Sequence, residues 1–236
     1  MSAGAPPLPA GWTPVALSRD LPAGTSLGAV CGGAEIVVWR DRGGTVRAWE
    51  DRCPHRGMKL SFGFVRGDRL ACLYHGWSFD GQGRCRTIPS HPDLAPPETI
   101  RVAGYDAREA LGMVWAANAG TGPATPVDEP DAAPLTPLRS LFVAAPVAVA
   151  AGALAQAGLA VGTAGAGEPV TGVDRHPGWM RLEQDGLRLV AGLQPVDAGH
   201  SALHLAAEGR LAPHQARALV RASAGLRRDI EGEAAR

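Results

Sequence analysis

The chain has 236 residues, 45% of them hydrophobic, which is enough for one large domain or two smaller ones with a real core. Its 23 basic and 23 acidic side chains cancel, so the overall charge indicates neither nucleic acid nor an anionic membrane surface as a partner. Aromatic residues are few whereas Gly and Pro are abundant, which favours short strands and turns over long bundled helices.

The first ten residues, rich in Ala, Gly and Pro, are expected to form a disordered lead. They contain neither the basic segment nor the apolar segment of a secretory signal, so we expect a cytoplasmic protein. In that compartment, four cysteines indicate metal ligation or buried thiols before disulfides.

Residues 11–119 have the pattern of a β domain. Short runs of β-branched and aromatic residues, EIVVWR and TVRAWE, flank the turn DRGG, and SFDGQGRCR predicts a second hairpin at Asp80-Gly81. Residues 120–138 are rich in Pro, Thr and Gly and predict a linker, which leaves 139–236 as a second domain.

Two motifs in the first domain carry the chemistry, CPHRG from Cys53 and CLYHGW from Cys72. Each pairs a cysteine with a histidine, His55 in the first and His75 in the second, and such pairs suit zinc or an iron–sulfur cluster. Zinc fingers more often combine Cys-x-x-Cys with a pair of histidines, whereas mixed loops match a [2Fe–2S] centre with two histidine ligands. A zinc knuckle, or a chance grouping of buried cysteines and surface histidines, stays open as an alternative.

The segment CPHRGMKLSFGFVRGDRLACLYHGWSFDGQGRCRTIPS, residues 53–90, resembles the Rieske non-haem iron oxygenases. The resemblance implies one Rieske-type [2Fe–2S] cluster, and it extends more loosely from residue 12 to residue 115. It places the following ligands: Cys53 and Cys72 on the buried iron, His55 and His75 on the outer iron.

The loops differ from those of respiratory Rieske proteins, which have an extra cysteine in each loop that forms a disulfide. This favours the oxygenase or ferredoxin type. The remaining cysteines, Cys31 and Cys85, are expected to be buried thiols.

The segment 40–86 holds ten basic and five acidic side chains. The resemblance implies a ferredoxin or flavin reductase as electron donor, and a basic surface would attract an acidic partner of this kind. An arginine-rich face that is merely solvated is the equal alternative.

The second domain contains a run without charge from Ser140 to Gly167. In the Rieske oxygenases a helix with the pattern N-x-x-D-x-x-H-x-x-x-x-H supplies two histidines to a mononuclear iron. Placed on GALAQAGLAVGT, this pattern falls on small residues throughout: Gly152, Ala155, Gly158 and Thr163. The resemblance therefore implies the iron helix without its ligands, and mononuclear Fe(II) is not expected.

Asp229 resembles the position of the family's carboxylate ligand, although a solvated helix charge is the expected role. The uncharged run is long enough to span a membrane, but Pro146, Gln156 and its Ala and Gly content argue against a span. The second domain is short for a catalytic domain of this family, so we expect a thin core that needs a partner subunit.

Further along the chain, WMRLEQDGLRLVAGLQPV and SALHLAAEGRL predict strands, and a helix is predicted from Pro213 onward. The expected fold is mainly β, a Rieske-type antiparallel β domain followed by a shortened oxygenase-like α+β domain.

These observations predict a Rieske [2Fe–2S] electron-transfer protein of the ring-hydroxylating and demethylating oxygenase family, without a catalytic iron of its own. An α-type oxygenase subunit is the expected partner in a hetero-oligomer. Two alternatives stay open: an active oxygenase with unrecognised iron ligands, and a scaffold subunit without redox function.

Overall fold

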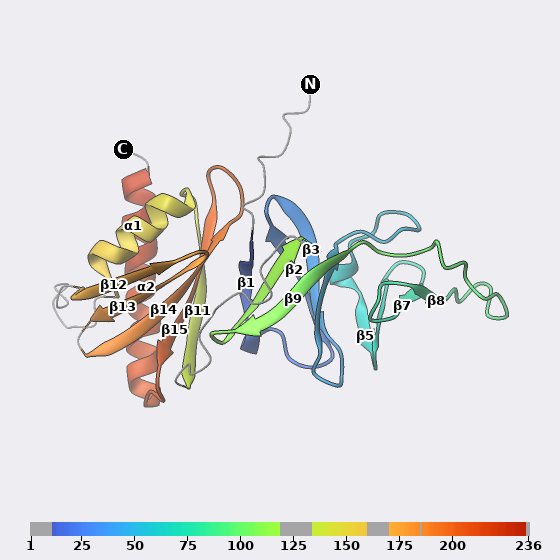
Figure 1. Ribbon diagram of the computed structural model, residues 1–236, viewed down its shortest axis with the longest axis horizontal. Helices are drawn as coiled ribbons and strands as arrows, with labels where there is room; N and C mark the ends of the chain where they lie inside the picture. The colour runs from blue at the N-terminus through green and yellow to red at the C-terminus, as the bar shows by residue number, and fades with distance from the viewer. Residues whose placement is uncertain (1–10, 119–133, 160–169, 185, 235–236) are drawn as a thin grey trace, which may run out of the picture.

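The computed structural model describes residues 11–118, 134–159, 170–184 and 186–234, and it contains two domains side by side (Figure 1). The first is built on antiparallel strands, and the second places two helices on one face of an antiparallel sheet. The fold is therefore mainly β with an α+β second domain, as the sequence predicts.

A six-stranded sheet forms the body of the first domain, in the order β1-β10-β9-β4-β3-β2. Its outermost strands, β1 and β2, also contact one another, so the sheet curls around the core between them. The strands are β1 (Thr13–Leu17), β2 (Thr25–Cys31), β3 (Ala34–Arg40), β4 (Val46–Glu50), β9 (Gly104–Ala110) and β10 (Met113–Asn118).

A smaller sheet of four short strands lies at the far end of the first domain, away from the second (Figure 1). A short 3-10 helix, η2 (Leu60–Phe62), precedes this sheet. Its strands follow one another in sequence order: β5 (Phe64–Arg66), β6 (Arg69–Ala71), β7 (Ser78–Phe79) and β8 (Cys85–Thr87).

The second domain has a five-stranded sheet in the order β11-β15-β14-β13-β12. Its elements are β11 (Leu135–Val143), α1 (Val147–Ala157), β12 (Gly172–His176), β13 (Trp179–Gln184), β14 (Leu187–Pro195), β15 (Ser201–Glu208) and α2 (Pro213–Ala234). Strand residues alternate between the two faces, so that Leu203 and Leu205 face the helices while His204 between them faces the other way.

The core of the second domain is larger than the sequence led us to expect. Side chains from β11, β13, β14 and β15 bury themselves against both helices, and Leu154, Leu219 and Ile230 close the core from the helix side. The expectation of a thin core was wrong because it was based on chain length. A five-stranded sheet with two covering helices needs few residues.

The helix in the uncharged run is shorter than the family pattern implies. Helix α1 ends at Ala157, and the next residue, Gly158, has φ +58° and ψ −146°, a conformation that glycine adopts far more easily than other residues. Gly152 and Ala155 are on α1, while Thr163 lies outside the described residues. Strand β11 begins at Leu135, within the expected linker; the bulge beside Pro137 and the edge position of β11 accommodate this proline.

None of the helices in the described part of the chain is long and apolar enough to cross a membrane. The described part of the uncharged run forms the end of β11 and the 11-residue helix α1.

The two domains share an apolar core on the sheet face that the helices leave uncovered. Leu17, Met113 and Trp115 of the first domain pack there against Trp179 and Val190 of the second. Burial of two tryptophans and their neighbours fixes the domains against each other.

Polar groups extend this interface. The Gln194 side-chain amide donates a hydrogen bond to the Val30 carbonyl across the domains (2.7 Å), and its oxygen accepts one from His204 Nε2 (3.0 Å). His204 is 1% exposed, and burial lowers its pKa from the ordinary 6.5 to about 4.

His204 should make the stability of the protein depend on pH. Below pH 6.5 the unfolded chain takes up a proton that the folded protein resists, so the free energy of unfolding falls as pH drops from 6.5 toward 4. The free energy of unfolding should fall by about 3 kcal/mol in total, and this loss is complete only below pH 4. We expect His204→Gln to abolish the loss. Urea unfolding at matched pH measures this difference.

His214→Gln, at the exposed start of α2, is the control and should leave the pH dependence of unfolding unchanged. Equal pH dependence in the unmodified protein and in His204→Gln would contradict the assignment of a buried neutral imidazole.

Candidate metal centre

Two loops of equivalent backbone structure contain the four candidate ligands. In the first loop, Cys53 N donates to the Met58 carbonyl (2.8 Å) and Gly57 N donates to the Cys53 carbonyl (2.8 Å). In the second loop, Cys72 N donates to the Trp77 carbonyl (2.9 Å) and Gly76 N to the Cys72 carbonyl (3.1 Å). The two cysteines thus occupy corresponding positions in two tight turns.

Each turn requires its glycine. Gly57 has φ +72° and Gly76 has φ +70°, in the left-handed region that other residues enter at a cost. A Cβ atom on Gly76 would also lie 3.0 Å from Cγ of Pro89. The motifs therefore specify the loop conformation as well as the candidate ligands.

The cysteine thiols face the interior of the first domain. Cys53 is 2% exposed and Cys72 is 3% exposed, in a core that includes Leu60, Leu70 and Phe79. Burial raises the pKa of the Cys53 thiol to about 11; the His55 backbone N–H opposes this rise, and the neighbouring Cys72 thiol adds to it. Binding of iron here must therefore displace thiol protons.

The histidines lie at the surface end of the same pair of loops. The ring centroids of His55 and His75 are 4.7 Å apart, and His55 stacks on Trp77 with centroids 4.4 Å apart and planes 5° apart. Slight burial lowers the pKa of His55, and the neighbouring His75 lowers it further. The structure thus brings all four predicted residues together, thiols inside and imidazoles outside.

The arrangement fits a two-iron cluster. The buried thiols of the two loops form one pair of candidate ligands, and the imidazoles form the other. A cluster with two cysteines on one iron and two histidines on the other needs only pairs, which the two loops provide.

A buried aspartate closes the base of the first loop. Asp51, 6% exposed, accepts hydrogen bonds from Ser61 N and Ser61 Oγ, both 2.7 Å. This pair was not predicted from the sequence, because the two residues are ten positions apart. The only feature of the sequence that could have indicated the contact is that Asp51 and Ser61 flank the first motif on its two sides.

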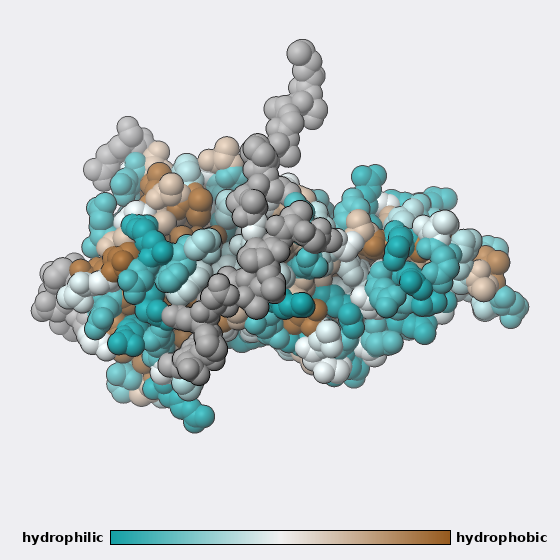
Figure 2. Space-filling model, in the orientation of Figure 1, coloured by the Kyte–Doolittle hydropathy of each residue, from teal (hydrophilic) through white to brown (hydrophobic). Residues whose placement is uncertain are grey.

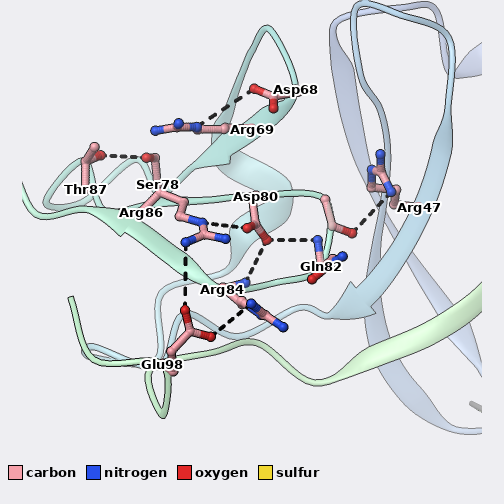
Figure 3. Close-up of polar contacts among 11 residues, drawn as sticks. Arg47, Asp68, Arg69, Ser78, Asp80, Gln82, Arg84, Arg86, Thr87 and Glu98 are labelled. Carbon is pink, nitrogen blue, oxygen red and sulfur yellow. Dashed lines mark hydrogen bonds and ion pairs between the residues drawn. The ribbon is translucent and has the colours of Figure 1, made fainter. Parts of the chain in front are cut away.

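A charged network supports the strands that carry the second loop (Figure 3). The Asp80 carboxylate accepts hydrogen bonds from the backbone N–H groups of Gln82 and Arg84 and from Arg86 Nε. Arg84 and Arg86 both reach Glu98, on the segment that follows the sheet. These bonds fix the hairpin predicted at Asp80-Gly81 and lower the pKa of Asp80 against the opposing effect of its burial.

The other two cysteines are buried thiols, as expected. Cys31 and Cys85 are each 4% exposed and free of disulfides, and burial raises the pKa of both.

A recess of about 390 Å³ lies beside the first loop and is lined by Arg52, Arg56 and Arg101 together with His55 and Glu50. No described residue forms an ion pair with these three arginines. In the space-filling view, hydrophilic side chains cover most of the visible surface at the end of the molecule that carries β5, β7 and β8 (Figure 1 and Figure 2). The recess beside His55 therefore carries a net positive charge, three arginines against Glu50.

Residues 11–101 match the family model described as the Rieske [2Fe-2S] domain. The chain is 42% identical over 125 residues to the oxidoreductase NdmD of Pseudomonas putida, covering 52% of this chain and 21% of that protein. It is 39% identical over 106 residues to the 3-chlorobenzoate-3,4-dioxygenase oxygenase subunit of Comamonas testosteroni, covering 44% of this chain and 24% of that protein. The matched segment thus spans about a quarter or less of these relatives.

Similarity of fold extends over nearly the whole chain. The structure of NdmA from Pseudomonas putida CBB5 superposes with a TM-score of 0.67 at 22% sequence identity, covering 94% of this chain and 81% of that one. Both domains of this chain therefore have counterparts in the NdmA structure, in a similar relative arrangement. This chain carries a Rieske [2Fe–2S] domain, which binds one cluster, and its homologues are members of the Rieske oxygenase family.

Proposed function

We propose that this chain transfers electrons through a [2Fe–2S] cluster, with Cys53 and Cys72 on one iron and His55 and His75 on the other. The main support is the geometry of the paired loops, which places two buried thiols and two surface imidazoles at one point. The cluster supplies one-electron chemistry when bound.

The residues around the proposed cluster site have different roles. The buried cysteines keep water away from the inner side of the site, and Leu60, Leu70 and Phe79 around them lower the local dielectric. His55 and His75 hold the outer side at the surface, where a partner can approach closely. Trp77 fixes the orientation of the His55 ring by stacking on it.

We further propose that the chain has no mononuclear iron site of its own. A Cβ atom on Gly158 would lie 2.1 Å from Gln184 Oε1, and this oxygen accepts a hydrogen bond from Leu159 N (2.8 Å). The position of the first expected histidine is therefore occupied by another side chain. Ala155 offers no carboxylate, and Asp229 is exposed on α2.

The electron donor is proposed to be an acidic ferredoxin or a flavin reductase that docks on the recess of Arg52, Arg56 and Arg101. Three guanidinium groups beside His55, which have no ion-pair partner among the described residues, attract carboxylates and steer an acidic protein toward the histidines. The acceptor is proposed to be an α-type oxygenase subunit in a hetero-oligomer.

Four free cysteines fit a reducing compartment, and we propose the cytoplasm as the place where the chain works.

The four candidate ligands are tested by single substitutions. Cys53→Ser, His55→Ala, Cys72→Ser and His75→Ala should each abolish the visible absorption and the electron paramagnetic resonance signal of a Rieske cluster, because every iron needs both protein ligands. Cys85→Ala replaces a nearby buried thiol outside the set and should keep both signals. A normal spectrum in any of the four variants contradicts the assignment.

Iron content distinguishes the proposed role from that of an active oxygenase. We expect about two irons per chain and no further signal from a mononuclear iron after addition of nitric oxide. About three irons per chain, with such a signal, would show an oxygenase with ligands that we have not recognised. A cluster that cannot be reduced reversibly would instead favour the scaffold alternative.

The donor surface is tested by charge reversal. Arg52→Glu combined with Arg101→Glu should slow reduction by a reduced acidic ferredoxin about 10-fold or more at low salt, and high salt should remove the difference. Stopped-flow reduction at several ionic strengths measures this effect. Arg217→Glu combined with Arg221→Glu, on the exposed face of α2, changes the net charge by the same amount and is the matched control. Equal slowing in the control would mean that only net charge matters.

A further inference from the structure

A cavity of about 500 Å³ lies between the two domains, separate from the paired loops. Its walls come from β1, β2 and η2 of the first domain and from β11, β14 and β15 of the second. It opens on the sheet face opposite α1 and α2, since Ser140 and His204 line it while their neighbours Leu141 and Leu203 face the helices.

The floor of the cavity is a chain of hydrogen bonds with a fixed direction. The Val30 carbonyl can only accept, so it fixes the Gln194 amide with its oxygen toward His204 Nε2, which must carry the proton. Nδ1 of the neutral ring then accepts from the Ser140 hydroxyl, 2.8 Å away. The proton of Ser140 is thereby engaged, and the lone pairs of its oxygen stay available to a hydrogen-bond donor.

Two phenylalanines from different domains line the cavity with their rings largely open to solvent. Phe62 on η2 is 62% exposed, and Phe142 on β11 is 59% exposed. Leu27, Val15 and Val196 add further apolar surface. Exposure of such rings to water is unfavourable, and a flat apolar ligand that packs against them would cover part of this surface.

The charges around the cavity disfavour anions. Glu35 and Asp51 line it together with Lys59, and Lys59 is already paired with Glu35 at 2.5 Å. Asp51 holds the stem of the first ligand loop through Ser61. The cavity thus combines apolar walls with hydrogen-bond acceptors and a net negative rim.

We propose that this cavity is a binding site for a small, uncharged aromatic molecule that carries a hydroxyl or amino donor. The ring packs against Phe62 and Phe142, and the donor binds to Ser140 Oγ. The site goes beyond the proposed electron transfer and needs no residue of the candidate cluster. Because Asp51 and Ser61 are shared with the base of the first loop, a bound ligand contacts the support of that loop.

The proposal is tested by titration calorimetry of the holoprotein with 2-naphthol. We expect one saturable site per chain, and Phe142→Ala or Phe62→Ala should weaken binding about 2- to 10-fold. Phe64→Ala removes a third exposed ring, 50% exposed and outside the cavity, and should leave the affinity unchanged. All three rings are exposed, so their removal should leave the fold intact.

Two further ligands test the polar part of the site. 2-Methoxynaphthalene lacks the donor and should bind about 3- to 10-fold more weakly than 2-naphthol, and Ser140→Ala should remove this difference. Naphthalene-2-sulfonate, an anion, should not bind. Absence of saturable binding, equal binding of the sulfonate, or equal weakening by Phe64→Ala would each overturn the proposal.

Discussion

Four backbone hydrogen bonds, two in each ligand loop, are the constraint on which the candidate centre depends. They place Cys53 and Cys72 at corresponding positions, so that one pair of turns defines both the buried and the exposed side of the site. The remaining architecture holds these turns still: Asp51 ties the stems of the first loop, and the Asp80 network fixes the hairpin after the second.

In the described part of the chain, the contact between the domains depends on side chains and not on backbone hydrogen bonds, and it combines an apolar core with a polar edge. Trp115 and Trp179 supply buried area, whereas Gln194 and His204 satisfy one another and the Val30 carbonyl. A buried imidazole without a charged neighbour can only be accommodated in its neutral form. The domain interface therefore has a proton-sensitive group, His204, at its edge.

Sequence reasoning predicted the parts of the structure that local patterns encode. The two Cys/His motifs, the hairpins and the final helix follow from spacing, turn residues and Pro213. The length of α1 could not be predicted in this way, because Gly158, where the helix ends, lies against Gln184 from a strand distant in sequence. The Asp51–Ser61 pair and the cavity between the domains also escaped, since tertiary contacts alone bring their residues together.

The close approach of Gln184 to Gly158 has a consequence for how this region can vary. A side chain at position 158 would displace the end of Gln184, and it would also have to adopt a backbone conformation that side chains disfavour. Displacing Gln184 breaks the hydrogen bond that its oxygen accepts from Leu159 N. Position 158 is therefore restricted to glycine unless the end of α1 and the side chain at 184 change together.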